Sequence, residues 1–350
     1  MIGKYSIKPQ STEAPGSFPA EKMNSSSCVF KTYDVIENKL LPSFYAITLI
    51  IGLVDNAWGL KLLLQNWQKL GTINIFVLNL GLANVLHLFT LPFLMVYYFT
   101  GKKWIFGNVL CKVTRLCFNL NLYCSIGFLT CISVYRYLAI VHTMRMKGRL
   151  TVTRSVVISV LVWVLVSVQS APDIFFPKTN RVKNKCFHST SLARTENYLK
   201  YSLVWTITGF CIPLLITLGC YGHVTLVLCR RNTIQKTLRQ KCVKFLFILI
   251  LLFSVCYIPY HIFWNLSLFS RVLYFKQRFC VWWDEHVFTG HQISRGLVTL
   301  NSALNPLVYL HMPEQIAAHI RQLPQRGCKI FNNFSVCSRR NISVSQTEDT

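Results

Sequence analysis

The chain contains seven long apolar stretches that carry almost no charged residues, and this pattern constrains its fold more than any other feature. A helix needs about 20 mostly apolar residues to cross a bilayer. Because no water reaches the hydrocarbon core, such stretches must satisfy their backbone groups within helices. We therefore predict an all-α membrane protein, a bundle of seven transmembrane helices. The expected spans are 42–64, 73–99, 109–134, 156–171 (extending through Pro172 to Phe176), 203–228, 243–269 and 287–310.

Charge is scarce in this chain and strongly unbalanced. Lys and Arg number 37 against 12 Asp and Glu, which leaves a formal charge of +25, and only 14% of the residues are charged. Soluble domains carry about 25% charged residues, so a soluble enzyme is not expected. The basic residues lie in short blocks between the apolar stretches, as membrane loops do, and not in the basic stripe of a nucleic-acid-binding domain. We therefore expect contact with membrane lipids and no nucleic-acid partner.

The sequence lacks the motifs of common membrane enzymes and transporters. It contains no H-E-x-x-H, G-x-S-x-G or glycine-rich phosphate loop, so no catalytic residue is expected. An odd number of spans without an internal repeat disfavours most transporter folds. The 14 cysteines lie mostly within apolar stretches and show no C-x-x-C spacing, so we expect neither a metal site nor a cofactor.

Seven spans place the two ends of the chain on opposite sides of the membrane. Clusters of Lys and Arg in one set of loops indicate the cytoplasmic side. The amino terminus is then extracellular, in agreement with a glycosylation sequon at Asn24. We expect an extracellular amino-terminal tail (1–41), a seven-transmembrane domain (42–310) and a cytoplasmic region (311–350) that begins with a short amphipathic helix along the membrane.

Polar and helix-breaking residues stand in the spans where a simple membrane anchor would have Leu. They are Asn56, Asn84 at the end of N-L-G-L-A-N, Arg136 in Y-R-Y, Trp163, Pro213, Tyr221, C-Y-I-P (256–259) and N-P-L-V-Y (305–309). Proline within a span frees backbone carbonyls and creates a bending point. Together these residues resemble the signature of the rhodopsin-like G-protein-coupled receptors. The resemblance implies a heterotrimeric G protein as partner and roles in coupling and activation for Arg136, Tyr221, Asn305, Pro306 and Tyr309.

The outer halves of the spans narrow the resemblance. They carry W-I-F-G (104–107), C-K (111–112), N-L-Y (121–123) and Q-I-S-R-G-L (292–297). This pattern resembles the metabotropic purinergic nucleotide receptors, most closely the ADP-responsive type, and relatives that sense small dicarboxylates share part of it. The resemblance implies an extracellular nucleotide, such as ADP or ATP, as the ligand.

Two disulfides are expected from cysteine spacing together with this resemblance. One joins Cys111, at the start of the third span, to Cys186 in the loop between spans four and five. The other joins Cys28 in the amino-terminal tail to Cys280 in the last outer loop. An oxidising exterior favours both bridges. The alternative is four free thiols.

Two arginines fall within the outer half of the bundle. Arg115 lies one helical turn after Cys111, and Arg295 lies 14 residues, about 21 Å of helix, before Tyr309. A charge retained inside a membrane indicates function, and guanidinium groups bind phosphate or carboxylate bidentately. We therefore predict a small-anion site with no carboxylate in reach, the alternative being that both arginines extend to the membrane interface. The other residues expected to line the site, from helical periodicity and resemblance, are Asn119, Tyr123, His261, His291 and Gln292.

Several positions depart from the pattern of these receptors. Trp264 stands where the purinergic pattern has Lys or Arg, so it either stacks on a nucleobase or packs against lipid or protein; Arg271 is expected in the loop that follows. Asn84 and Tyr135 stand where the wider family carries acids, and Asp55 is the only acid in the first three spans. These changes favour a lost or altered sodium-binding role and raised basal signalling.

The pattern as a whole predicts a plasma-membrane receptor and not an enzyme. Such a receptor performs no chemical step, because its ligand shifts the population between two conformations of the bundle. Two alternatives stay open at this point. The ligand is a small carboxylate metabolite such as succinate or oxoglutarate, or the protein is a decoy that binds without signalling.

Overall fold

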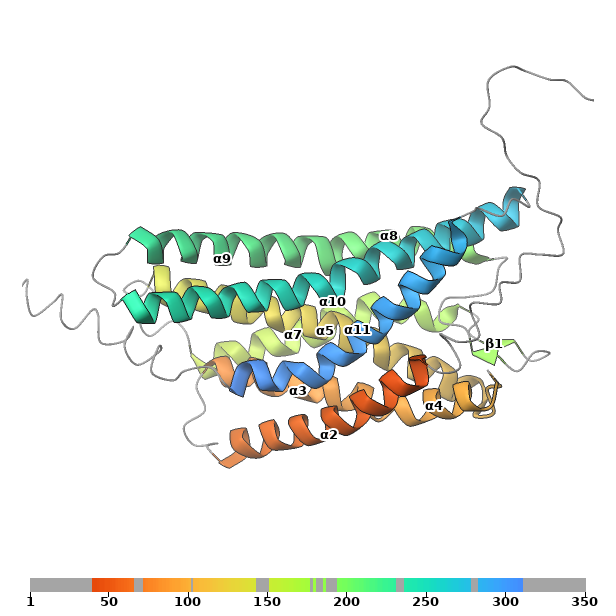
Figure 1. Ribbon diagram of the computed structural model, residues 1–350, viewed down its shortest axis with the longest axis horizontal. Coiled ribbons are helices and arrows are strands. Elements are labelled where there is room, and N and C mark those ends of the chain that lie inside the picture. The colour runs from red at the N-terminus through yellow and green to blue at the C-terminus, as the bar shows by residue number, and fades with distance from the viewer. Residues whose placement is uncertain are drawn as a thin grey trace, which may run out of the picture.

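The computed structural model describes residues 40–65, 72–101, 103–142, 151–176, 179–180, 185–186, 194–230, 236–277 and 283–310. Figure 1 shows long helices lying side by side. In chain order they are α2 (Leu41–Gln65), α3 (Thr72–Leu88), α4 (Leu91–Phe99), α5 (Gly107–Val141), α7 (Val152–Phe175), α8 (Thr195–Thr206), η4 (Ile207–Cys211), α9 (Ile212–Arg230), α10 (Lys236–Gln277) and α11 (Asp284–Leu310).

The described helices form seven rods, which confirms the fold class predicted from the sequence. Helices α3 and α4 follow one another as one rod, and α8, η4 and α9 follow one another as a second. Helix α11 packs against both α10 and α2, so the last rod meets the first and closes the bundle.

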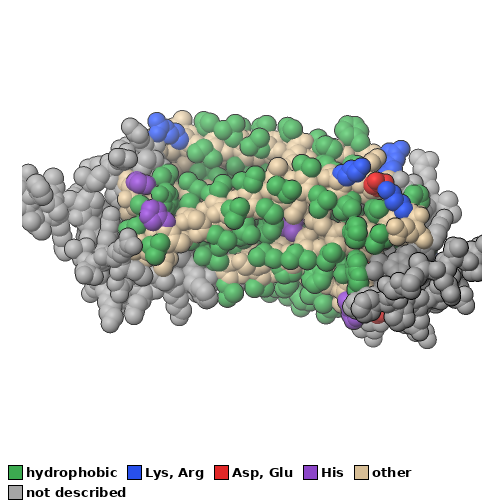
Figure 2. Space-filling view, turned by 90° about the horizontal axis from the view of Figure 1, so that it is seen from above, with side chains coloured by type: hydrophobic (Ala, Val, Ile, Leu, Met, Phe, Trp, Pro, Cys, Tyr) green, Lys and Arg blue, Asp and Glu red, His purple; other side chains and the backbone are tan. Residues whose placement is uncertain are grey.

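The outside of the bundle is suited to lipid. Within the described residues, five rods have the length and hydropathy of a membrane span: Leu41–Lys61, Thr72–Phe99, Gly107–Val141, Val152–Phe175 and Thr195–Val227. Figure 2 shows hydrophobic side chains over the middle of the visible face and Lys and Arg only towards its ends. An apolar surface of this extent is unfavourable in water and favourable in a bilayer.

The second rod is broken where a proline requires it. Helix α3 ends at Leu88 and α4 begins at Leu91. Pro92 lies in the first turn of α4, where its missing N–H group costs no helical hydrogen bond. The hydroxyl of Thr90 donates to the carbonyl of His87 at 2.7 Å, which satisfies a backbone acceptor at the break.

Prolines also mark irregular points in other rods. Pro172 and Pro259 lie inside α7 and α10, and both helices continue past them. The π-helical segment η4 ends just before Pro213. Such segments interrupt the regular ladder of hydrogen bonds.

The loop between α7 and α8 contains a small hairpin that the all-α prediction does not include. Strand β1 (Thr179–Asn180) pairs antiparallel with β2 (Lys185–Cys186), and Thr179 lies opposite Cys186. The predicted tail residues before 40 and the whole of 311–350 lie outside the described residues, as do Asn24, Cys28 and Cys280.

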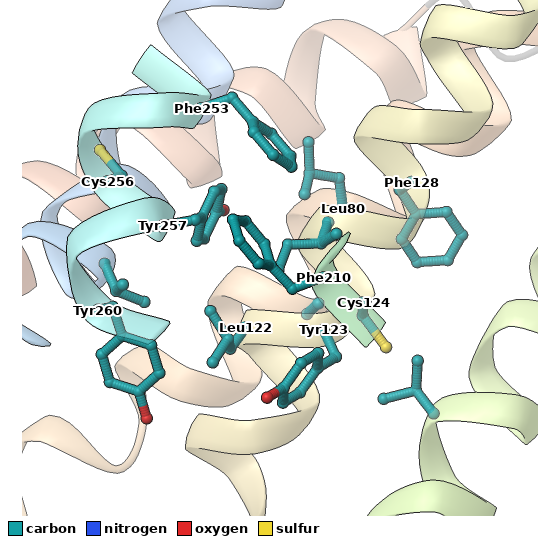
Figure 3. Close-up of a cluster of buried hydrophobic side chains, with 14 of the residues drawn as sticks. Leu80, Leu122, Tyr123, Cys124, Phe128, Phe210, Phe253, Cys256, Tyr257 and Tyr260 are labelled. Carbon is teal, nitrogen blue, oxygen red and sulfur yellow. The ribbon is translucent and has the colours of Figure 1, made fainter. Parts of the chain in front are cut away.

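A cluster of aromatic and aliphatic side chains fills the interior between the rods (Figure 3). Phe210 of η4 stacks on Phe253 of α10, with ring centroids 6.2 Å apart. Leu122 of α5 packs in the same cluster. Tyr123 and Tyr260 carry their hydroxyl groups at the lower edge of the cluster in Figure 3. The packing of this cluster therefore fixes the positions of the polar groups that Tyr123 of α5 and Tyr260 of α10 carry at its edge.

Candidate functional site

The two arginines predicted from the sequence lie inside the bundle. Arg115 of α5 is 4% exposed and Arg295 of α11 is 3% exposed, so neither extends to the membrane interface. The two guanidinium groups are close enough to interact electrostatically. Burying two like charges near each other is unfavourable. The fold therefore holds a concentrated positive charge in its interior.

Each arginine is held by a neutral oxygen of another segment. Arg115 donates from a terminal nitrogen to the carbonyl of Cys186 at 3.2 Å, and Arg295 donates to the hydroxyl of Tyr98 at 2.6 Å. Tyr98 packs against Tyr45, with ring centroids 6.0 Å apart. These contacts fix the direction of both guanidinium groups without neutralising their charge.

The disulfide between Cys111 and Cys186 is confirmed, with Cα atoms 5.8 Å apart. It ties strand β2 to α5 near the start of that helix, one turn before Arg115. Because the carbonyl of Cys186 accepts a hydrogen bond from Arg115, the disulfide also sets the position of that acceptor.

The aromatic residues expected at the site come together around Tyr260 of α10. The ring of Tyr260 lies 5.3 Å from that of His261 and 5.9 Å from that of His291. His261 stacks on Phe210 at 4.3 Å, and Tyr123 lies 5.8 Å from His261. Tyr260 also interacts electrostatically with both arginines. Gln292 is buried on the same helix as Arg295.

Asn119 brings a carboxylate to the site, which corrects the expectation that none is in reach. Its side-chain nitrogen donates to one oxygen of Asp173 in α7 at 3.2 Å. The hydroxyl of Tyr198 in α8 donates to the other oxygen at 2.7 Å. Asp173 is 2% exposed. One signal in the sequence could have found Asp173, because an ionisable residue within a span indicates function, as it does for the two arginines. Asp173 was missed because periodicity within α5 does not show which residue of α7 faces Asn119.

The structure selects one of the alternatives for Trp264 and corrects the expected position of Arg271. Trp264 does not face lipid; it is buried, with its ring 4.9 Å from His291 and 6.1 Å from Tyr198. Arg271 lies in the helix and not in a loop, because no glycine or proline follows Pro259 before α10 ends at Gln277. It interacts electrostatically with His291. The outer end of α10 therefore adds a third cation to this side of the bundle.

The residues expected to act in signalling lie at the other end of α5. Arg136 is buried, and Tyr221 of α9 hydrogen-bonds to Arg136 and Ser133. Asn305 is buried in α11. Pro306 and Tyr309 belong to the same helix, but their side chains lie outside the described set.

A closed ring of hydrogen bonds joins four helices between these two ends. Asn84 donates to Asn56 at 3.3 Å and Asn121 donates to Asn84 at 3.0 Å. The hydroxyl of Ser302 donates to Asn121 at 2.8 Å, and Asn56 donates to the carbonyl of Ser302 at 3.2 Å. The ring is made of amide, hydroxyl and carbonyl groups and contains no carboxylate.

Comparison with known proteins gives the family. The family described as "7 transmembrane receptor (rhodopsin family)" matches residues 59–309. The purinoceptor 1 of Rattus norvegicus is 37% identical over 272 residues, which cover 77% of this chain and 73% of the relative. The purinoceptor 1 of Homo sapiens is 36% identical over the same shares of both chains. The 2-oxoglutarate receptor 1 of Rattus norvegicus is 34% identical over 274 residues, 77% of this chain and 80% of the relative.

The family match extends over most of the seven rods and includes both arginines of the site. It agrees with the apolar outer surface of a protein that crosses the plasma membrane several times. The chain therefore belongs to the rhodopsin family of seven-transmembrane receptors, and it is a receptor and not an enzyme.

Proposed function

We propose that this receptor binds an extracellular nucleotide, such as ADP or ATP, and signals through a heterotrimeric G protein. The observation that carries the proposal is the pair Arg115 and Arg295, buried from two different helices and close enough to interact. A phosphate chain between them would relieve their mutual repulsion. The name purinoceptor, which the rat and human relatives carry, supports a purine ligand.

The chemistry of the site suits phosphate groups. A guanidinium group presents a rigid fork of donors that binds two oxygens of a phosphate at once, and it stays charged when buried. Arg115 and Arg295 would contact the phosphates, and Asn119, Tyr123, His261, His291 and Gln292 would lie around the rest of the ligand. In this arrangement the side that carries the disulfide and the amino terminus is extracellular.

Signalling requires a ligand that binds one conformation of the bundle more tightly than the other. An anion held by Arg115 and Arg295 joins α5 to α11, and α11 packs on α10. We assign the response at the cytoplasmic end to Arg136 and Tyr221, with Asn305, Pro306 and Tyr309 acting in α11. The tails 1–41 and 311–350 complete the domain organisation that we propose.

A ligand panel tests the proposal. Cells that express the full chain are exposed to ADP, ATP, UDP, succinate and oxoglutarate, and G-protein activation is recorded. Arg115→Ala and Arg295→Ala are each expected to lower nucleotide potency at least about tenfold, since each removes a charged partner of a buried anion. Lys200→Ala, which removes an exposed cation of α8, serves as the control. A nucleotide response that is undiminished in both arginine variants contradicts the site.

A carboxylate metabolite is the second candidate ligand. The 34% identity to 2-oxoglutarate receptor 1 favours it, and a guanidinium fork binds carboxylate as well as phosphate. A response to oxoglutarate or succinate that requires both arginines, with none to nucleotides, would select this candidate. Binding without G-protein activation would identify a decoy receptor.

A further inference from the structure

Asp173 places a buried negative charge on the α7 side of the site that holds Arg115 and Arg295. Its carboxylate is buried, and it accepts hydrogen bonds from Asn119 of α5 and Tyr198 of α8. Tyr260 interacts electrostatically with Asp173 as well as with Arg115 and Arg295. Tyr260 therefore lies near charges of both signs. One end of the site carries the two arginines, and the other end carries the carboxylate of Asp173.

Aromatic rings surround the carboxylate end. The ring of Tyr198 lies 4.9 Å from Phe176, 5.8 Å from Tyr201 and 6.1 Å from Trp264. Tyr201 lies 5.3 Å from Trp205. Flat rings of this kind favour a planar, uncharged group over a hydrated anion.

Three buried ring nitrogens near the carboxylate end have no hydrogen-bond partner among the described residues. The indole nitrogen of Trp205 is buried, and within the described part of the chain it has no hydrogen-bond partner. The same holds for both ring nitrogens of His261. Tyr123 connects the two residues, stacking on Trp205 at 4.5 Å and lying 5.8 Å from His261. Buried polar atoms usually have partners, so these three nitrogens suit a ligand that offers both donors and acceptors.

We propose that Asp173, together with Asn119 and Tyr198, forms a second subsite that accepts hydrogen bonds from the uncharged, donor-bearing end of the ligand. Each oxygen of a carboxylate can accept more than one hydrogen bond, so a ligand donor can bind to the same oxygens as Asn119 and Tyr198. The inference rests on the proposed function, because it needs the anionic end of the ligand to be held by Arg115 and Arg295.

The subsite discriminates between the two candidate ligands. A nucleotide has phosphates at one end and amine and hydroxyl donors at the other, which matches the polarity of the site. A dicarboxylate is anionic at both ends, so it has no donor-bearing end for Asp173 to accept from, and Asp173 repels its negative charge. Placing like charges together is a strong means of rejecting a wrong partner. Asp173 therefore acts as a specificity determinant that favours nucleotides.

The test uses the purified full-length receptor in lipid nanodiscs, with ADP, pyrophosphate and 2-oxoglutarate as probes and the dissociation constant as the readout. Asp173→Asn is expected to weaken ADP binding about tenfold, since the charged acceptor is replaced by a neutral amide. The same variant is expected to leave pyrophosphate unchanged and to strengthen 2-oxoglutarate binding. Glu196→Gln removes an exposed acid near the start of α8 and controls for the change in net charge.

A second experiment keeps the inference testable if Asp173→Asn does not fold. Wild-type receptor is titrated with an ADP analogue whose exocyclic amine is dimethylated and with an ADP analogue that lacks both ribose hydroxyls. The first has lost the amine donors and the second the hydroxyl donors. At least one of them is expected to bind about tenfold more weakly than ADP.

The results distinguish a failure of the subsite from a failure of the proposed function. An unchanged ratio of ADP to 2-oxoglutarate affinity in Asp173→Asn overturns the subsite, as does equal binding of ADP and both analogues. If Arg115→Ala and Arg295→Ala still abolish ADP binding in that case, the proposed function stands. If ADP binding does not depend on the arginines, both proposals fail.

Discussion

Arg295 of α11 donates a hydrogen bond to the hydroxyl of Tyr98 in α4, at 2.6 Å. Both residues are buried, so this bond sets the direction of a guanidinium group that is shielded from bulk solvent. The bond also ties the last rod of the bundle to the outer half of the second.

Tyr98→Phe is therefore expected to weaken the binding of the anionic ligand. The change keeps the ring and removes only the hydroxyl, so Arg295 loses a neutral partner that holds it in place. We expect affinity to fall about threefold to tenfold, measured by equilibrium binding to membranes. Tyr274→Phe removes a hydroxyl from an exposed position in α10 and should have no effect. Equal behaviour of the two variants would show that Tyr98 does not position Arg295.

Gly209 lies where a larger residue would disturb the aromatic base of the site. A Cβ atom there would come within 2.8 Å of both Trp205 and Tyr123, whereas a Cβ atom at Gly219 would meet nothing within 4 Å. We expect Gly209→Ala to destabilise the receptor by about 1–3 kcal/mol. Gly219→Ala should be neutral or stabilising by up to about 1 kcal/mol.

Thermal unfolding of the two glycine variants in the same detergent gives the comparison, and ligand affinity is measured beside it. Gly209→Ala should also bind ligand more weakly, because Tyr123 must shift. If Gly209→Ala and Gly219→Ala had the same Tm, the rings of Trp205 and Tyr123 would be able to move aside without loss of stability.

The uncharged ring of Asn56, Asn84, Asn121 and Ser302 predicts that sodium has little effect on this receptor. A cation in the membrane interior needs a negative partner, and the ring offers none. The neighbouring acid, Asp55, has a buried carboxylate oxygen without a hydrogen-bond partner among the described residues. We expect wild-type agonist affinity to be the same in sodium and choline chloride. In Asn84→Asp, sodium should lower agonist affinity about fivefold or more.

Agonist binding in the two salts, with potassium as a further control, checks this expectation. Strong sodium inhibition of the wild type would contradict it. If that inhibition disappeared in Asp55→Asn, Asp55 would supply the charge that Asn84 lacks.

The contact between Tyr221 and Arg136 predicts a separation of binding from signalling. Tyr221 hydrogen-bonds to Arg136 and Ser133 far from the arginine pair. Tyr221→Phe should reduce agonist-stimulated nucleotide exchange on purified G proteins about tenfold, since a hydrogen bond to a charged group is lost in one conformation only. Agonist affinity measured without G protein should stay the same. If agonist affinity fell to the same extent, Tyr221 would contribute to the stability of the receptor and not specifically to signalling.

The sequence by itself determined the seven rods, because each apolar stretch has only one way to satisfy its backbone in a bilayer. It also located Arg115 and Arg295 in the outer half of the bundle, since the rise of a helix is fixed and depth follows from residue counting. Family resemblance, in turn, identified the disulfide between Cys111 and Cys186.

The tertiary structure decided which faces of different helices meet. Counting along α5 places Asn119 near Arg115, but only the packing of α7 and α8 brings Asp173 and Tyr198 to it. In the same way, hydropathy places Trp264 near the outer end of its span, and packing turns it inward onto His291. The rotation of a helix about its axis depends on contacts with its neighbours, which the apolar character of a span does not encode. For that reason the arginine pair was visible in the sequence, and the carboxylate that opposes it was not.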